Sequence, residues 1–212
     1  MEKGILPDYC IWDFNGTILN DVDAGIRAVN HLLAERGLPI IESREAYQRI
    51  FGFPIRAYYE RLGFDFEREP YEVIAPLWVE QYWKTVKDAE LFEDVKETLE
   101  RLRSLGIRQT VLSATHKDML TAQLTQLGVH GYFEELLGLD NIHAASKLSL
   151  AEDWRRRNPE ARAIFLGDTD HDLDTARSIG AECFLIARGH QSAERLRPLG
   201  VPILSTLREL PI

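Results

Sequence analysis

The chain has 212 residues, of which 45% are hydrophobic and 28% are charged, and this composition excludes disordered, collagenous and fibrous proteins. Its 34 acidic residues outnumber 25 basic ones, and the formal net charge of −9 argues against a nucleic-acid partner. No apolar run reaches the roughly 18 residues that span a bilayer, and the first eight residues lack the apolar stretch of a signal peptide. We therefore expect a soluble, cytoplasmic protein without a membrane partner.

The first predicted strand covers residues 9–14 and runs directly into a turn at residues 15–17. Its apolar composition predicts that the strand is buried. Cys10 lies in this run, and Cys183 lies in a second apolar run near the C-terminus. We expect both to be buried free thiols in a reducing compartment.

A series of helices is predicted after the first strand. The first of these helices has Asn20 or Asp21 as its cap and Gly37 as its stop. No strand pattern occurs between residues 42 and 89, where many aromatic residues predict packing between small helices. The helical segments in this stretch are expected at residues 43–51, 54–62 and 71–87. Together they indicate a separate helical subdomain.

Helices and strands alternate in the rest of the chain. Predicted helices cover residues 93–105, 117–127, 147–157 and 172–179, and predicted strands cover residues 107–113, 163–167, 182–187 and 201–204, with a short element near 132–137. This alternation is typical of a parallel sheet covered by helices on both faces, so the predicted fold class is α/β with a doubly wound, mostly parallel sheet. Such sheets bind ligands at the carboxyl ends of their strands.

Polar residues occur at four points that would meet at that edge of the sheet. They are residues 13–17, the triplet Ser113-Ala114-Thr115, Lys147, and the acidic run at residues 167–172. A carboxylate, a hydroxyl, an ammonium group and an acidic cluster together suit a phosphoryl group bound with a divalent cation. No single one of these signals would be convincing alone.

In kind and in order, these signals resemble the motifs of the haloacid dehalogenase-like (HAD) superfamily, and especially its phosphoglycolate-phosphatase-like branch. The resemblance covers essentially the whole chain. It implies a Rossmann-like core formed by residues 1–19 and 88–212, with residues 20–87 inserted as a helical, C1-type cap that closes over the active site. It also implies Mg²⁺-dependent hydrolysis of a phosphoric monoester, with a small phosphorylated metabolite as substrate. Monomer and homodimer both stay open.

The resemblance implies a role for each matched acidic residue. Asp13 is the nucleophile that forms an aspartyl-phosphate, which water then hydrolyses. Mg²⁺ is held by Asp13, by the backbone carbonyl of Asn15 and by Asp168, and Asp172 orients the metal's shell. The cation screens the repulsion between the carboxylate and the phosphate.

The other matched residues are implied to handle the phosphate. Ser113, with Ala114 beside it, donates to a phosphate oxygen, and Lys147 pairs with the nucleophile and with the transferring phosphoryl charge. Gly16 lets the backbone turn tightly past the phosphate, and the Thr17 side chain bonds back to that turn.

Asn15 departs from the family pattern, because most phosphatases of the family carry an Asp there as the acid and base. Asn has no proton to exchange, and general acid–base catalysis is worth about 10² to 10⁴ in rate. Three interpretations follow. The enzyme uses a good leaving group or borrows a base such as His116 or His171, it transfers the phosphoryl group slowly, or it binds without turnover.

Two alternatives to a phosphatase stay open. The first is a regulatory protein that binds phosphate and Mg²⁺ with weak or no turnover, for which Asn15 is the support. The second is a phosphonate hydrolase, which needs a cap lysine for a Schiff base, and Lys84 and Lys87 are the candidates. Within the predicted cap, Arg56 is a candidate contact for an anionic substrate.

Overall fold

A computed structural model describes residues 6–139 and 146–212 of the chain, so the first five residues of the predicted core segment 1–19 lie outside the described part. The strands are β1 (Tyr9–Trp12), β2 (Arg108–His116), β3 (Glu135–Leu139), β4 (Ala163–Gly167), β5 (Glu182–Ile186) and β6 (Ile203–Leu204). The α-helices are α1 (Val22–Glu35), α2 (Arg44–Ile50), α3 (Ile55–Arg61), α4 (Tyr71–Thr85), α5 (Val95–Ser104), α6 (Lys117–Gln126), α7 (Lys147–Arg157), α8 (Asp170–Ser178) and α9 (Ala193–Leu196). Single 3-10 turns occur at η1 (His130–Tyr132), η2 (Arg197–Leu199) and η3 (Leu207–Glu209).

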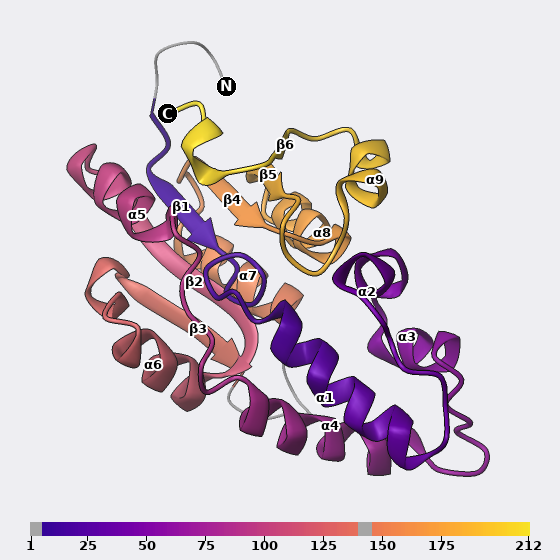
Figure 1. Cartoon of the computed structure of the whole chain (residues 1–212). Helices are drawn as coiled ribbons and strands as arrows, with labels where there is room; N and C mark the ends of the chain where they lie inside the picture. Colours follow the sequence, from indigo (N-terminus) through magenta and orange to yellow (C-terminus); the bar gives the residue numbers. More distant parts are fainter. Residues whose placement is uncertain (1–5, 140–145) are drawn as a thin grey trace.

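The six strands form one sheet in the order β3-β2-β1-β4-β5-β6, and every neighbouring pair is parallel (Figure 1). β1 lies near the middle, where Tyr9 is in register with Arg108 of β2 on one side and with Ala163 of β4 on the other. The chain therefore winds outward in both directions from β1. This confirms the predicted doubly wound parallel sheet.

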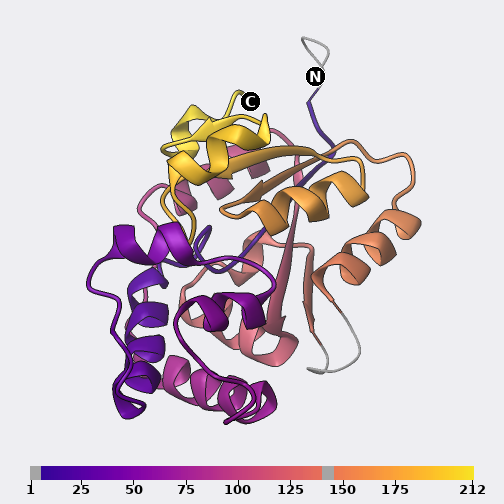
Figure 2. The same ribbon diagram turned by 90° about the vertical axis from the view of Figure 1, so that its right-hand side faces the viewer.

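Alternate residues of β1 enter two separate hydrophobic cores, because successive side chains of a strand point to opposite faces. Cys10 and Trp12 pack in the core that includes residues of α5 and α6. Tyr9 and Ile11 pack in the core that includes residues of α7 and α8. Figure 2 shows helices on both sides of the sheet. Because both faces are covered, the central strands β1 and β4 are apolar and buried throughout.

Helices α1 to α4 form a helical unit, residues 22–85, beyond the carboxyl ends of the strands (Figure 1). It has a hydrophobic cluster of its own, with contributions from all four helices, which includes Val29, Leu32, Tyr47, Tyr58, Tyr59 and Ile74. The aromatic residues of this stretch pack mainly against one another, as in the stacked pair Tyr47–Phe51, whose ring centroids are 5.1 Å apart. Residues 42–89, all of which the structure describes, contain helices and turns and no strand.

Several helix and strand boundaries differ from those predicted from the sequence. Helix α8 begins at Asp170, two residues earlier than predicted, because Thr169 caps it in a capping box with Asp172. Strand β2 continues to His116, three residues beyond the predicted end. The element near 132–137 is the short strand β3 preceded by η1, and α9 was not predicted.

Asp21 is the N-cap residue of α1, one of the two candidates that the sequence offered, but its carboxylate makes no capping hydrogen bond. It accepts hydrogen bonds from the Gly16 backbone, Asn15 and Tyr82 instead. An acidic residue at a helix start has several possible partners, and the sequence pattern does not distinguish them.

Both cysteines are buried and free, and burial raises the pKa of each thiol. Among the described residues, no helix has the length and hydropathy that crossing a membrane requires.

Asp94, just before α5, ties the C-terminal segment to the loop that follows β5. Its carboxylate accepts hydrogen bonds from Arg188 at 2.7 Å, from the Thr206 hydroxyl at 2.6 Å and from the Leu207 backbone at 2.9 Å. Burial alone would raise the pKa of Asp94, but these hydrogen bonds and the charge of Arg188 lower it to about 2. The loop that leaves β5 is therefore held in place by a buried ion pair.

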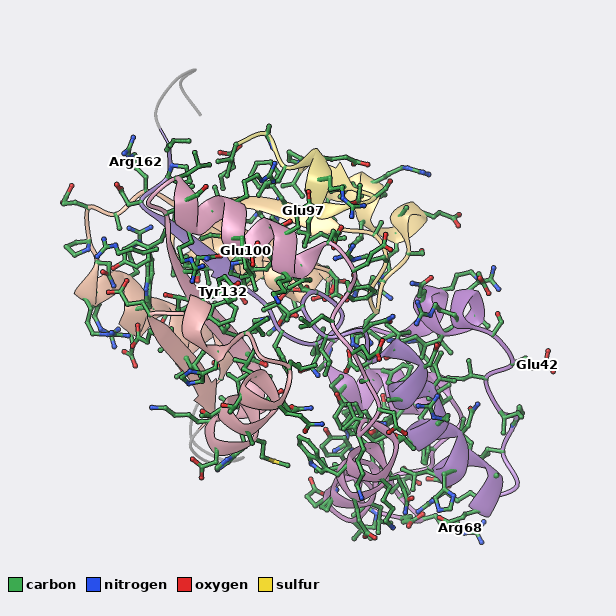
Figure 3. All side chains as sticks on the ribbon, turned by 60° about the vertical axis from the view of Figure 1, so that its left-hand side comes forward. Glu42, Arg68, Glu97, Glu100, Tyr132 and Arg162 are labelled. Atoms are coloured by element: carbon green, nitrogen blue, oxygen red, sulfur yellow. The ribbon has the colours of Figure 1, made fainter. Side chains whose placement is uncertain are left out.

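Asp94→Ala leaves the Arg188 guanidinium without its partner, so we expect the free energy of unfolding to fall by about 3 to 5 kcal/mol in urea titrations. The carboxylate stabilises the fold above its unfolded pKa of about 4, and this contribution is lost as the pH falls toward 2. The difference between wild type and variant should therefore shrink over that range. Glu97→Ala is the control, since Glu97 lies on the exposed side of α5 (Figure 3) and pairs there with Arg208. Equal losses in the two variants would contradict this account.

Candidate active site

Four charged side chains meet where β1 and β4 end. The Lys147 ammonium donates hydrogen bonds to Oδ1 of Asp13 and, at 2.5 Å, to Oδ1 of Asp172. One carboxylate oxygen from each of Asp13, Asp168 and Asp172 lies within 4.8 Å of the others. All four residues are buried. The structure thus brings together the charged residues that the sequence singled out at this edge.

Helix α7 delivers Lys147 to the cluster. Ser146 caps this helix in a capping box with Ser149, which fixes the helix start at the lysine itself. Only 5% of the Lys147 side chain is exposed. Burial opposes its charge, but the neighbouring carboxylates Asp13 and Asp172 raise its pKa above the ordinary value. The ammonium is therefore a fixed positive charge beside Asp13.

The three carboxylates of the cluster, when ionised, carry more negative charge than the one lysine balances. Burial raises the pKa of Asp13, and Asp172 adds to this effect while Lys147 opposes it. Burial also raises the pKa of Asp168 well above its ordinary value. The charged forms of these two groups need a further cation close by.

The carboxylate of Asp172 is already bonded on both oxygens. Oδ1 accepts from Lys147, and Oδ2 accepts from the Asp168 backbone at 3.0 Å, the Thr169 backbone at 2.9 Å and the Thr169 hydroxyl at 2.7 Å. These bonds and Lys147 lower the pKa of Asp172 although burial works against them. The Asp172 carboxylate therefore holds the Asp168 backbone and the Lys147 ammonium in place.

The turn after β1 brings Gly16 and Thr17 against Asp168. Gly16 has a φ of +77°, and a Cβ atom there would overlap the Asp168 carboxylate and the His190 ring. The Thr17 hydroxyl donates to Oδ1 of Asp168 at 3.3 Å, whereas the sequence suggested a bond back to the turn. Both residues thus help to fix the place of Asp168.

Ser113 and Ala114 lie near the end of β2, with Ser113 buried and Ala114 exposed. The Ser113 hydroxyl donates to the Thr115 hydroxyl at 3.1 Å, and Thr115 in turn donates to Oδ1 of Asn15 at 2.8 Å. The amide nitrogen of Asn15 donates to Oδ2 of Asp21 at 2.9 Å and to the Tyr82 hydroxyl at 2.8 Å. The Asn15 side chain is therefore bonded to the turn before α1, to α4 and to β2.

His190 is a site residue that sequence reasoning missed. It follows β5, its backbone N–H donates to Oδ2 of Asp168 at 2.5 Å, and its Nε2 lies 3.5 Å from Oδ1 of Asp21. Burial opposes the charge of the ring, but Asp21 and Asp168 raise the pKa of His190 to about 9, so the imidazolium form dominates at neutral pH. The signal that could have found it is its place just beyond a strand of the same parallel sheet.

Helix α2 and the segment after it rest on the loops that carry Asp168 and His190. The Tyr47 hydroxyl lies 2.8 Å from Nδ1 of His190, and the Gln48 amide donates to the Gly189 carbonyl at 2.6 Å. Phe53 stacks on His171 with ring centroids 4.5 Å apart. Burial lowers the pKa of His171, and His116, the other histidine considered from the sequence, ends β2.

The candidate residues of the helical unit lie on its surface. Arg56 is exposed on α3, where its guanidinium pairs with Glu60 and lies over the Phe66 ring. Lys84 is exposed on α4 and pairs with Glu80 at 2.6 Å. The described contacts of these residues are thus with the helical unit itself.

The carboxylate cluster fits a magnesium ion in its donor chemistry. Mg²⁺ prefers oxygen ligands, and buried carboxylate oxygens from three aspartates converge here. When all three carboxylates are ionised, one ammonium leaves two negative charges in a buried site, which a divalent cation would balance.

Comparisons with known proteins agree with this architecture. The family model described as haloacid dehalogenase-like hydrolase matches residues 10–186. The chain is 25% identical over 200 residues to the phosphoglycolate phosphatase of Pseudomonas savastanoi pv. phaseolicola, covering 88% of this chain and 72% of that protein. It is 24% identical over 196 residues to the tyrosine-protein kinase PtkA of Mycobacterium tuberculosis, covering 91% of this chain and 66% of that protein.

Superposition on a solved structure supports the same fold. The haloacid dehalogenase-like family hydrolase of Streptococcus pneumoniae superposes with a TM-score of 0.79 at 18% identity, covering 93% of each chain. With a family match over most of its length, the chain belongs to the haloacid dehalogenase-like hydrolases.

Gly189 offers a direct test of the Asp168 position, because a Cβ atom there would overlap Oδ2 of Asp168 and the Gly16 carbonyl oxygen. In Gly189→Ala we expect the Mg²⁺ concentration that protects the protein in thermal melts to rise at least about tenfold, at a stability cost of about 1 to 3 kcal/mol. Gly131→Ala is the matched control, since a Cβ atom there meets no heavy atom within 4 Å. An unchanged Mg²⁺ requirement in Gly189→Ala would contradict the role given to Asp168.

Proposed function

We propose that the protein is a Mg²⁺-dependent phosphatase that hydrolyses a small organic phosphate through an aspartyl-phosphate at Asp13. The observation that carries this proposal is the buried ammonium of Lys147, bonded to Asp13 in a cluster with two further carboxylates. The names of curated relatives, among them several phosphoglycolate phosphatases, support a small phosphate ester as the substrate class. Phosphoglycolate itself is one candidate.

In the first step, an oxygen of Asp13 forms a bond to phosphorus while the bond to the leaving oxygen breaks. Lys147 holds Oδ1 of Asp13 and favours the ionised carboxylate against the effect of burial, and the other oxygen would attack the substrate. Ser113 would donate its hydroxyl to a phosphate oxygen. Water then attacks the phosphorus, which releases inorganic phosphate and restores the carboxylate.

Asp13, Asp168 and the backbone carbonyl of Asn15 would hold the metal, and Asp172 would orient its shell. When bound, Mg²⁺ supplies positive charge that screens the repulsion between the carboxylate and the phosphate. The chain's own contribution is to fix these oxygens, through Lys147 and through the hydrogen bonds to Asp172.

Asn15 cannot protonate a leaving group, so we infer a preference for substrates whose leaving group departs without a proton, such as acyl phosphates. The helical unit and its two flanking residues on each side, residues 20–87 in all, would act as a cap that excludes water and selects the substrate. Residues 1–19 and 88–212 would form the core. Arg56, exposed on α3, stays a candidate contact for an anionic substrate.

A second candidate function is a regulatory protein that binds phosphate and Mg²⁺ without useful turnover. The observation that favours it is the Asn15 side chain, which is bonded to Asp21, Tyr82 and Thr115 and has no proton to exchange. A phosphonate hydrolase is less well supported, since the Lys84 ammonium pairs with Glu80 on an exposed face.

The test is phosphate release from a panel of phosphate esters, acyl phosphates and phosphonates, with Mg²⁺ or with EDTA. We expect Mg²⁺-dependent turnover by the wild type and a loss of at least about 10³-fold in Asp13→Ala. Lys96→Ala, on the exposed face of α5, is the control for surface changes. Phosphate binding without turnover across the panel would favour the regulatory protein, and equal turnover in Asp13→Ala would overturn the mechanism.

A further inference from the structure

The two connections between the sheet and the helical unit lie side by side. Leu19 forms an antiparallel bridge with Leu91, and the Asn20 backbone donates to the Glu90 carbonyl at 2.9 Å. We call residues 18–21 and 86–92 the two stems. Any movement of the helical unit relative to the sheet must pass through them.

Asn15 bonds directly to this junction. Its amide nitrogen donates to the Asp21 carboxylate in the first stem and to the hydroxyl of Tyr82, near the end of α4 just before the second stem. The Tyr82 hydroxyl also donates to Oδ2 of Asp21 at 2.6 Å, which closes a triangle of three buried or half-buried side chains. The ring of Tyr82 stacks on Trp78 with centroids 4.9 Å apart.

The Asn15 side chain also reaches the end of β2, where Ser113 lies. Oδ1 of Asn15 accepts from Thr115, and the Thr115 hydroxyl accepts from Ser113. A continuous chain of hydrogen bonds therefore runs from Ser113 through Thr115 and Asn15 to Asp21 and Tyr82. An amide suits the middle of this chain, because it donates on one side and accepts on the other.

We propose that Asn15 is a positioning residue that couples the two stems of the helical unit to the Ser113 edge, and that the buried carboxylate of Asp21 dictates the amide at this position. An Asp at position 15 would place a second carboxylate oxygen about where Nδ2 now lies, 2.9 Å from Oδ2 of Asp21. The two groups would compete for the Tyr82 hydroxyl instead of sharing it. Asn15 is then the partner of Asp21 rather than a disabled acid.

The direct consequence is that exchanging the two side chains should restore what either single change removes. In the double variant Asn15→Asp/Asp21→Asn, the amide at position 21 would donate to the carboxylate at position 15. The Tyr82 hydroxyl can reverse, donating to position 15 and accepting from position 21, and Thr115 can still donate to position 15. Only the ion pair of Asp21 with His190 is lost from the junction.

The experiment compares both single variants with the double variant. It uses amide hydrogen exchange of the two stems in the protein alone, and kcat and KM with an acyl phosphate as the probe. We expect Asn15→Asp to lose about tenfold in stem protection and in kcat/KM, mainly through a higher KM, and the double variant to be less impaired than either single variant. Tyr82→Phe should weaken stem protection, whereas Tyr71→Phe, on the same helix with its ring against Tyr59 and Phe66, should not.

The kinetic part rests on the proposed phosphatase function, but the exchange part does not, so failure of the one is distinguishable from failure of the other. A higher kcat in Asn15→Asp alone would overturn the proposal, because it would make Asn15 a missing acid. Stem protection that is unchanged in Asn15→Asp, or losses that simply add in the double variant, would overturn it equally.

Discussion

The bond from Lys147 to two buried carboxylates is the interaction on which the site depends. Asp13 and Asp172 come from different elements, after β1 and inside α8, and the ammonium at the start of α7 draws them together. Without this cation, buried carboxylates so close to one another would repel or take up protons. Because the lysine balances only one of three negative charges, the fold leaves a demand for a divalent cation at the edge of the sheet.

Around this cluster lies a second layer that joins the sheet to the helical unit. His190 bonds to Asp168 through its backbone and faces Asp21 and Tyr47 with its ring. Asn15 joins Asp21 to Tyr82 in the same region. The groups that fix the helical unit therefore touch the groups that fix the carboxylates.

The sequence predicted the sheet and the charged cluster because both follow from general rules. Strands that alternate with helices wind into a parallel sheet, and polar residues that follow such strands meet at one edge. The proximity of Asp13, Lys147 and Asp168 could therefore be predicted from the sequence alone. The boundaries of α7 and β4 also agree with the prediction to the residue.

The second layer escaped prediction for a physical reason. Asp21 has the sequence signature of a helix cap, and Tyr82 has that of an aromatic packing residue, and neither signature says which partner is chosen. His190 needed a link between the β5 loop and α2, which lie far apart in the sequence. Periodicity reports which face a residue occupies, whereas a hydrogen-bond partner across the fold depends on the tertiary arrangement.

The central claim is that the carboxylates around Lys147 form a site for one divalent cation. Isothermal titration of Mg²⁺ into the substrate-free protein at neutral pH tests it most directly, with Asp168→Asn as the comparison. The account predicts one site per chain in the wild type and binding at least about tenfold weaker in Asp168→Asn, since that variant removes a carboxylate ligand and one of the unbalanced charges. Absence of binding by the wild type, or equal affinity in both proteins, would contradict it.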